Sequence, residues 1–210
     1  MTPQDSSPAA SAGKSVGRFF WELIKAFLIA VVIIVPIRYF LVQPFFVRGA
    51  SMEPTYLDGE YLVIDQLSYR FREPRRGEVI VFRYPKQPAQ FFIKRIIALP
   101  GERVAIHDGQ VTIFNDTHPR GVLLDESQYL TDGVRTGGQV EMQLDGDEYF
   151  VLGDNRPASS DSRSWGALEK DGIIGRSWVR AYPFDRLDVF ELNVPGFIAI
   201  PQQNIQEGVL

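Results

Sequence analysis

The sequence predicts a mainly β fold, in which one membrane-spanning helix precedes a coiled, antiparallel β domain. Two observations carry this prediction. Beyond residue 44, short runs rich in Val, Ile, Phe and Tyr alternate with turn residues, and no convincing stretch of helical periodicity occurs. Nearer the N-terminus, residues 19–47 contain only three charged side chains, Glu22, Lys25 and Arg38. We therefore expect a β domain over residues 44–210.

Several runs in this domain have the composition of strands and are bounded by turn signals. The expected strands cover residues 60–65, 77–84, 91–99, 103–108, 110–115, 148–154 and 177–184. Asp108-Gly109 between two of them is a strong hairpin signal. Residues 103–147 are expected to be a β-rich insertion without catalytic chemistry. The tail after Asp185 is expected to be a loop or an edge strand.

The charge-poor segment has the features of a membrane anchor. Its charge-free centre, Ala26–Ile37, is flanked by Lys25 and Arg38, whose long side chains can reach lipid headgroups. Residues 18–43 exceed the roughly 20 residues that a span needs, so we expect a transmembrane anchor there. A buried core helix and a cleavable signal peptide are the alternatives, although no small-x-small cleavage site follows. The small, polar residues 1–17 are expected to be a disordered tail.

The distribution of basic residues predicts the orientation of this anchor. Lys14, Arg18 and Lys25 precede or open the segment, whereas acidic residues follow it closely. Basic residues favour the cytoplasmic side of a membrane. We expect the N-terminus in the cytoplasm and residues 44–210 on the outer side of the cytoplasmic membrane.

Composition argues against several classes of site. The chain has no cysteine, which excludes disulfides, thiolate nucleophiles and cysteine-bound zinc. Its two histidines lie in no metal-binding spacing motif. The formal net charge of -4 lacks the basic footprint of a nucleic-acid-binding protein. We expect no metal, no other cofactor and no nucleic-acid partner.

A serine and a lysine are the best candidates for catalysis. Ser51 follows Gly49 and Ala50, where a substrate can approach the backbone closely. A serine hydroxyl becomes an effective nucleophile only when a base takes its proton. Lys94 lies in an apolar run, where burial can lower a lysine pKa until the amine serves as that base. An ordinary surface lysine is the alternative interpretation.

Four blocks of sequence stand out in the chain. They are GASMEPT (49–55), RRGEVIVF (75–82), FIKRIIALPGE (92–102) and GDNRPASSDSRSWG (153–166). Taken together and in this order, they closely resemble the signatures of type I signal peptidases. The resemblance implies a signal-peptidase-like catalytic sheet, with Ser51 as the nucleophile and Lys94 as the general base.

The same resemblance assigns supporting roles around this dyad. Ser159 matches a second serine that orients the lysine amine. Asp161 and Arg163 match an ion pair that supports the site, and Arg95 with Asp154 is expected to form another ion pair.

The resemblance also implies how the substrate is bound. Two segments, Phe45–Gly49 and Gln90–Ile93, are expected to hold an extended peptide through main-chain hydrogen bonds. Some family members carry a serine where this chain has Gly49, so its oxyanion hole should rely on backbone N–H groups, chiefly that of Ser51. The expected substrate contacts are Phe45, Val47, Gly49, Met52, Tyr56 and Ile93. Ordinary core packing is the alternative for the apolar ones.

These features predict a monomeric, membrane-bound endopeptidase whose partners are the lipid bilayer and preproteins that carry signal peptides. Two other hypotheses stay open. A Ser/Lys self-cleaving regulator would use the same dyad, although the chain has no basic DNA-binding region. A non-enzymatic, anchored peptide-binding domain would explain the strands but not the four ordered blocks.

Overall fold

The structure is a computed structural model that describes residues 9–36, 42–190 and 194–198. The chain divides into two compact units, residues 1–42 and residues 43–210. The boundary between them falls immediately before the first residues expected to bind substrate.

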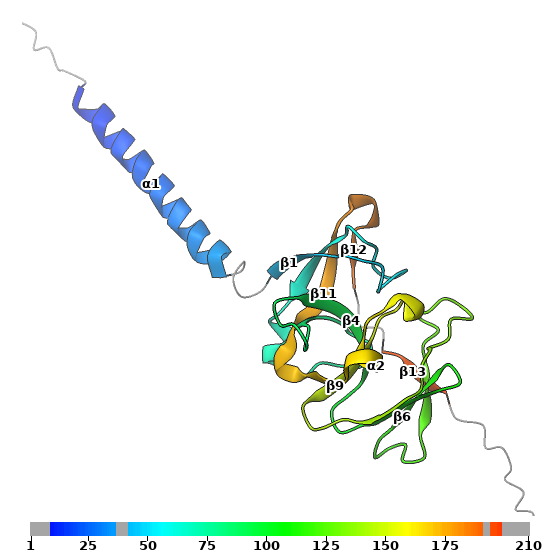
Figure 1. Ribbon diagram of the computed structural model, residues 1–210. Coiled ribbons are helices and arrows are strands. Elements are labelled where there is room, and N and C mark those ends of the chain that lie inside the picture. Colours follow the sequence, from blue (N-terminus) through cyan, green and yellow to red (C-terminus); the bar gives the residue numbers. More distant parts are fainter. Residues whose placement is uncertain (1–8, 37–41, 191–193, 199–210) are drawn as a thin grey trace, which may run out of the picture. The chain divides into compact units, whose positions relative to one another are not determined.

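The first unit contains helix α1 (Ala9–Pro36), drawn in blue in Figure 1. The helix begins in an alanine-rich stretch, and alanine is the best helix former. Residues 9–17, which we expected within a disordered tail, are therefore helical, whereas residues 1–8 lie outside the described part of the chain.

A transmembrane helix over residues 18–43 is not supported. Within the described residues, no helix combines the length and the apolar character that crossing a membrane requires. Glu22 and Lys25 lie inside α1 and form an ion pair of 2.9 Å, which shortens the uninterrupted apolar stretch. Residues 37–41 of the expected anchor lie outside the described residues.

The second unit is built on an eight-stranded sheet in the order β1-β2-β11-β3-β4-β9-β10, with β12 paired to β11 (Figure 1). Its described pairings are antiparallel. The strands are β1 (Val42–Phe46), β2 (Tyr61–Asp65), β3 (Val79–Arg83), β4 (Phe91–Ala98), β9 (Glu148–Leu152), β10 (Leu168–Glu169), β11 (Ile173–Tyr182) and β12 (Asp188–Val189).

A second, five-stranded sheet has the order β13-β7-β6-β5-β8. Asp108 and Gly109 both have positive φ, 51° and 80°, as a tight hairpin turn between β5 and β6 requires. The insertion thus forms a sheet, and β13 adds to it an edge strand from the C-terminal tail, as expected. The strands are β5 (Arg103–His107), β6 (Gln110–Phe114), β7 (Val122–Asp125), β8 (Val140–Gln143) and β13 (Gly196–Ile198).

Helical structure in this unit is confined to short turns among its described residues. Helix α2 (Ser162–Trp165) is a single turn, and the rest are 3₁₀ turns. The 3₁₀ turns are η2 (Ser68–Arg70), η3 (Arg156–Ala158), η4 (Lys170–Gly172) and η5 (Phe184–Arg186).

Buried side chains cover both faces of the larger sheet. On β3, Val79 and Val81 join one core cluster while Ile80 and Phe82 join another, as strand alternation requires. A third cluster packs Ile97 and other residues of β4 and β9 against the smaller sheet. Each fully buried side chain of this size contributes roughly 1.5–3 kcal/mol, so the strands that carry the candidate site are firmly held.

Candidate active site

Ser51 lies in a loop that leaves β1 and returns to β2. The loop is closed at its base by hydrogen bonds from Val47 N–H to the Glu60 carbonyl oxygen, at 2.8 Å, and from Gly59 N–H to the Val47 carbonyl oxygen, at 3.0 Å. Gly49 has φ +85°, a conformation that other residues rarely adopt. Its N–H donates to Asp58 Oδ1 at 2.6 Å, so it is not free to bind a substrate oxygen.

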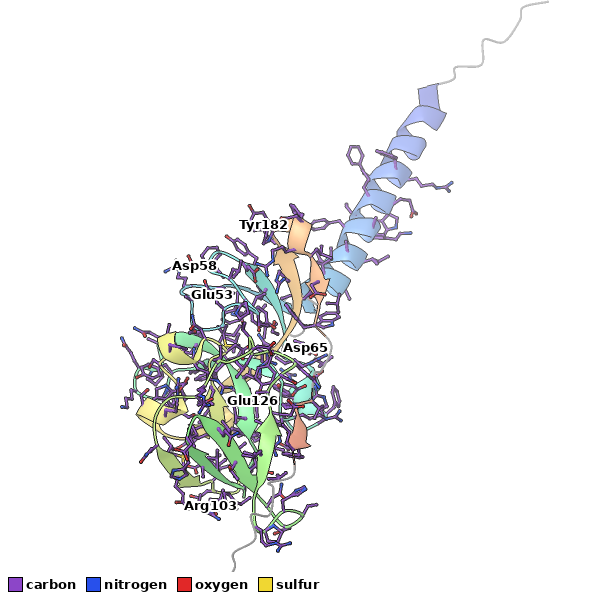
Figure 2. The ribbon with its side chains drawn as sticks, turned by 90° about the vertical axis from the view of Figure 1, so that its right-hand side faces the viewer. Glu53, Asp58, Asp65, Arg103, Glu126 and Tyr182 are labelled. Carbon is purple, nitrogen blue, oxygen red and sulfur yellow. The ribbon has the colours of Figure 1, made fainter. Side chains whose placement is uncertain are left out.

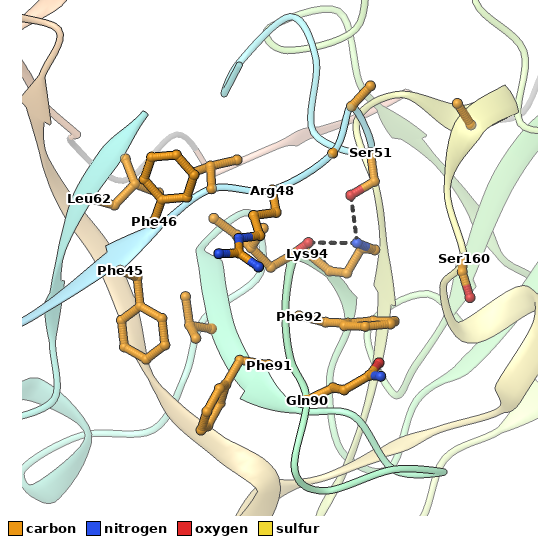
Figure 3. A pocket seen from close by; sticks show the side chains of 16 residues that line it. Phe45, Phe46, Arg48, Ser51, Leu62, Gln90, Phe91, Phe92, Lys94 and Ser160 are labelled. Atoms are coloured by element: carbon orange, nitrogen blue, oxygen red, sulfur yellow. Dashed lines mark hydrogen bonds between the residues drawn. The ribbon is translucent and has the colours of Figure 1, made fainter. Parts of the chain in front are cut away.

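Lys94 lies on β4 and reaches the serine directly. Its Nζ atom donates hydrogen bonds of 2.8 Å to Ser51 Oγ and of 2.8 Å to the carbonyl oxygen of Ile93, as Figure 3 shows. Only 3% of Lys94 is exposed. This burial lowers the pKa of Lys94 to about 8, although the charges of Asp161 and Asp154 act in the opposite direction. An ordinary surface lysine is thereby excluded.

Ser159 does not orient Lys94 through the expected hydrogen bond. The Ser159 Oγ atom is buried and has no partner of ordinary hydrogen-bond geometry among the described residues. The second hydrogen bond of the Lys94 amine goes to the Ile93 carbonyl oxygen instead. Ser159 lies near Asp161 and helps to lower the pKa of that carboxyl.

The Asp161 carboxylate and Arg163 form the expected ion pair. Arg163 Nε lies 2.8 Å from Asp161 Oδ1, and Arg163 Nη2 lies 2.8 Å from Oδ2. Asp161 also caps helix α2 and accepts the Gly153 N–H at 3.1 Å. Burial alone would raise the pKa of Asp161, but the hydrogen bonds from Arg163 and Gly153 help to hold it below its ordinary value.

Arg95 and Asp154 form a second, fully buried ion pair. Arg95 Nε and Nη2 donate to the two carboxylate oxygens of Asp154 at 2.8 and 2.6 Å, and Nη1 donates to the Gly77 carbonyl oxygen at 2.8 Å. Thr55 Oγ1 donates to Asp154 Oδ2 at 2.6 Å. Through Asp154, Arg95 is therefore connected both to the loop before Ser159 and to the segment after Ser51.

Asn155 is a site residue that the sequence analysis did not single out. Its side-chain Nδ2 donates to the Ala50 carbonyl oxygen at 3.0 Å, and its backbone N–H donates to the Ser51 carbonyl oxygen at 3.0 Å. It thus fixes the peptide groups on both sides of Ser51, including the one that carries the Ser51 N–H. Its place in the Gly-Asp-Asn-Arg block was a possible signal, but its partner lies 105 residues away in the chain.

The insertion, residues 103–147, makes supporting contacts with two arginines close to the site. Arg156, next to Asn155, is buried and donates to the Glu126 carboxylate, 2.9 Å from Oε2, and to Thr136. Figure 2 shows Glu126 in the middle of this view of the unit and Arg103 near its lower end. The side chain of Tyr129 also packs under Arg95, with the guanidinium carbon 4.1 Å from the ring centroid. Arg156 and Arg95 are buried, and a buried charge needs partners because water is excluded. By supplying such partners, the insertion supports the segment around Asn155.

A groove of about 650 Å³ runs past the Ser51–Lys94 pair. Of the expected substrate contacts, Phe45, Val47, Gly49 and Ile93 line it. Met52 and Tyr56 do not; each is 1% exposed and belongs to the core beneath the Ser51 loop. Their apolar character is compatible with substrate contact and with core packing, and the structure shows core packing. The groove is also lined by Phe46, Arg48, Ala50, Leu62, Val81, Gln90, Phe91, Phe92, Ala158 and Ser160.

Comparison with known proteins agrees with this geometry. Residues 20–182 match the model of a family described as signal peptidase, peptidase S26. The chain belongs to this family. Because the family comprises peptidases, a non-enzymatic role as a peptide-binding domain is no longer a competing interpretation.

Curated relatives of this signal peptidase family member match most of its length. A protein of Synechocystis sp. named "Probable signal peptidase I-2" is 37% identical, over 79% of this chain and 75% of the relative. Signal peptidase I of Leptolyngbya laminosa is 36% identical, over 89% and 92%. Signal peptidase I of Bacillus licheniformis is 33% identical, over 84% and 95%. The likeness therefore extends across both units of the chain.

Proposed function

We propose that this peptidase removes N-terminal signal peptides from exported preproteins, with Ser51 as the nucleophile and Lys94 as the general base. One observation carries the assignment of the dyad. The buried Lys94 Nζ lies 2.8 Å from Ser51 Oγ in the wall of a groove. A lysine whose pKa is about 8 is partly neutral near physiological pH, as a general base must be.

The neutral amine takes the hydroxyl proton as Ser51 Oγ attacks the scissile carbonyl carbon. A C–O bond forms and the carbonyl oxygen becomes negatively charged. Lys94 then gives the proton to the leaving amine as the C–N bond breaks, which leaves an acyl-enzyme. Water then repeats the sequence: Lys94 takes a proton from water as the water oxygen attacks the ester carbon. The proton goes to Ser51 Oγ as the ester C–O bond breaks, which releases the peptide with a new carboxyl end.

The oxyanion in this proposal binds to the backbone N–H of Ser51. Among the described residues this group donates no hydrogen bond, so it is available to the substrate. The two carbonyl groups that flank it are held by Asn155. Such a fixed donor is effective because it needs no reorganisation when charge develops.

Attachment to a membrane is a further part of the proposal. Taken by itself, α1 presents apolar side chains on its surface, among them Phe19, Trp21, Phe27, Ile29 and Val32. A helix of this kind needs an apolar environment. Full-length protein should resist alkaline carbonate extraction, whereas a chain without residues 1–42 should be released. Release of the full-length chain would contradict attachment. The single-pass topology with a cytoplasmic N-terminus stays a prediction, which a protease-protection experiment can test.

The activity is tested by incubating the detergent-solubilised full-length protein with a preprotein and sequencing the new N-terminus. We expect one cut at the end of the signal peptide. Ser51→Ala and Lys94→Ala should each abolish it, whereas Ser127→Ala and Lys86→Ala, outside the site, should not. Cleavage of the chain itself and of no preprotein would favour the self-cleaving regulator.

A further inference from the structure

The groove lining includes a positively charged side chain, that of Arg48, which the proposed mechanism does not use. Arg48 lies on the segment between β1 and Ser51, and it lines the groove together with the dyad. Its side chain is exposed, with the guanidinium carbon 5.9 Å from the centroid of the Phe46 ring. Figure 3 shows the guanidinium among the residues that surround the groove.

Arg48 has no acidic partner within the described residues. The guanidinium of Arg48 lies over the aromatic ring of Phe46, and this contact leaves its N–H groups free for another acceptor. The groove lining contains no aspartate or glutamate. When Lys94 is neutral, Arg48 is the only charged side chain among the described residues that line the groove.

The position of Arg48 limits where an acidic group on the substrate can lie. It lies three positions before Ser51 in the chain, and three residues of extended chain span at most about 11 Å. A peptide that follows the groove with its scissile carbonyl at Ser51 therefore passes the backbone of Arg48 within about three residues of the cut.

We propose that Arg48 is a specificity-determining residue that favours preproteins carrying an acidic side chain close to the scissile bond. The inference rests on the proposed function and names a substrate class for the same groove. An ion pair at a partly exposed position favours the charged substrate roughly fivefold over its neutral counterpart, and a lysine at that position is disfavoured.

The test uses full-length protein and a series of signal-peptide substrates. Asp, Asn or Lys is placed in turn at each position from three residues before the cut to two residues after it, and kcat/KM is measured at low ionic strength. At one position the wild-type protein should prefer Asp over Asn and Asn over Lys. Arg48→Gln should remove this order and Arg48→Glu should reverse it. The control Arg83→Gln, on β3 and outside the groove lining, should keep it.

Two outcomes would overturn the inference without affecting the proposed function. In the first, wild-type protein cleaves the Asp, Asn and Lys peptides equally at every position. In the second, the Arg48 variants change all rates alike, and only in vesicles that contain phosphatidylglycerol; Arg48 would then contact lipid. Failure to cleave any peptide of the series would instead contradict the proposed function.

Discussion

The backbone N–H of Asn155 lies 3.0 Å from the carbonyl oxygen of Ser51 and donates a hydrogen bond to it. The preceding residue, Asp154, binds Arg95, which follows Lys94 in the chain. Two adjacent residues therefore hold both halves of the dyad: Asp154 holds β4, which carries Lys94, and Asn155 holds the loop that carries Ser51. The short distance between Lys94 and Ser51 is a consequence of this shared support.

Replacing Asn155 with Ala should impair catalysis more than substrate binding. The substitution removes the side-chain hydrogen bond to the Ala50 carbonyl oxygen but keeps the backbone one. We expect kcat to fall about fivefold to tenfold, the effect of one lost hydrogen bond, with KM little changed. Asn115→Ala, which removes a hydrogen bond to Glu102 beside the ends of β5 and β6, is the control. An equal change of kcat in both variants would argue against a positioning role.

Gly153→Ala should inactivate the protein because the site has no room for a methyl group. An added Cβ would lie 2.2 Å from Ser159 Oγ and 2.4 Å from the Ser51 carbonyl oxygen, both far inside van der Waals contact. The Ser51 loop would have to move away from Lys94. Gly146→Ala, which meets no atom within 4 Å, should keep full activity. Wild-type cleavage rates in Gly153→Ala would contradict the tight packing described here.

The ion pair between Glu126 and Arg156 predicts that the insertion stabilises the whole unit. Glu126→Gln leaves the guanidinium of Arg156, whose side chain is 0% exposed, without a counter-charge. Breaking a buried ion pair in this way costs about 3–5 kcal/mol of unfolding free energy. Glu141→Gln removes the exposed partner of Arg103, in an ion pair whose side chains are 36% and 56% accessible, and should cost less than ~1 kcal/mol. Denaturant unfolding of both variants measures the difference, and similar values would contradict this account.

Lys94→Met should make the protein inactive yet more stable at low pH. The pKa of Lys94 is lowered from 10.5 to about 8 on folding, so the unfolded chain binds more protons between these values. The wild-type protein is therefore destabilised below pH 8 by roughly 3 kcal/mol, and this cost disappears as pH rises toward 10.5. The advantage of Lys94→Met in unfolding free energy should shrink over the same window. Lys86→Met, at an exposed lysine, should show no such trend.

The β character of the second unit could be predicted because apolar alternation and turn residues are local signals. The Asp108-Gly109 hairpin was predicted for the same reason. Strand β8 was missed since its sequence, Val-Glu-Met-Gln, has only half-buried and exposed positions. Strand β7 was missed because its four residues are too few to show a period.

The catalytic candidates could be predicted from ordered sequence blocks, but their support could not. Asn155 and Glu126 act through partners far along the chain, and no local pattern indicates such a pairing. The apolar residues Met52 and Tyr56 were expected in the groove because hydrophobicity alone does not distinguish a pocket wall from a core. In each case the deciding information was tertiary.

The pH dependence of kcat/KM for signal-peptide cleavage tests the role of Lys94 most directly. Because the base must be neutral, activity should rise with pH, pass through a midpoint at about 8 and reach a plateau above it. Because the stability of the wild-type protein rises in the same direction, circular dichroism at each pH serves as the control that the chain is folded wherever kcat/KM is measured. A rate that is flat between pH 6 and 10, or one that falls as pH rises through 8, would contradict a general base at Lys94.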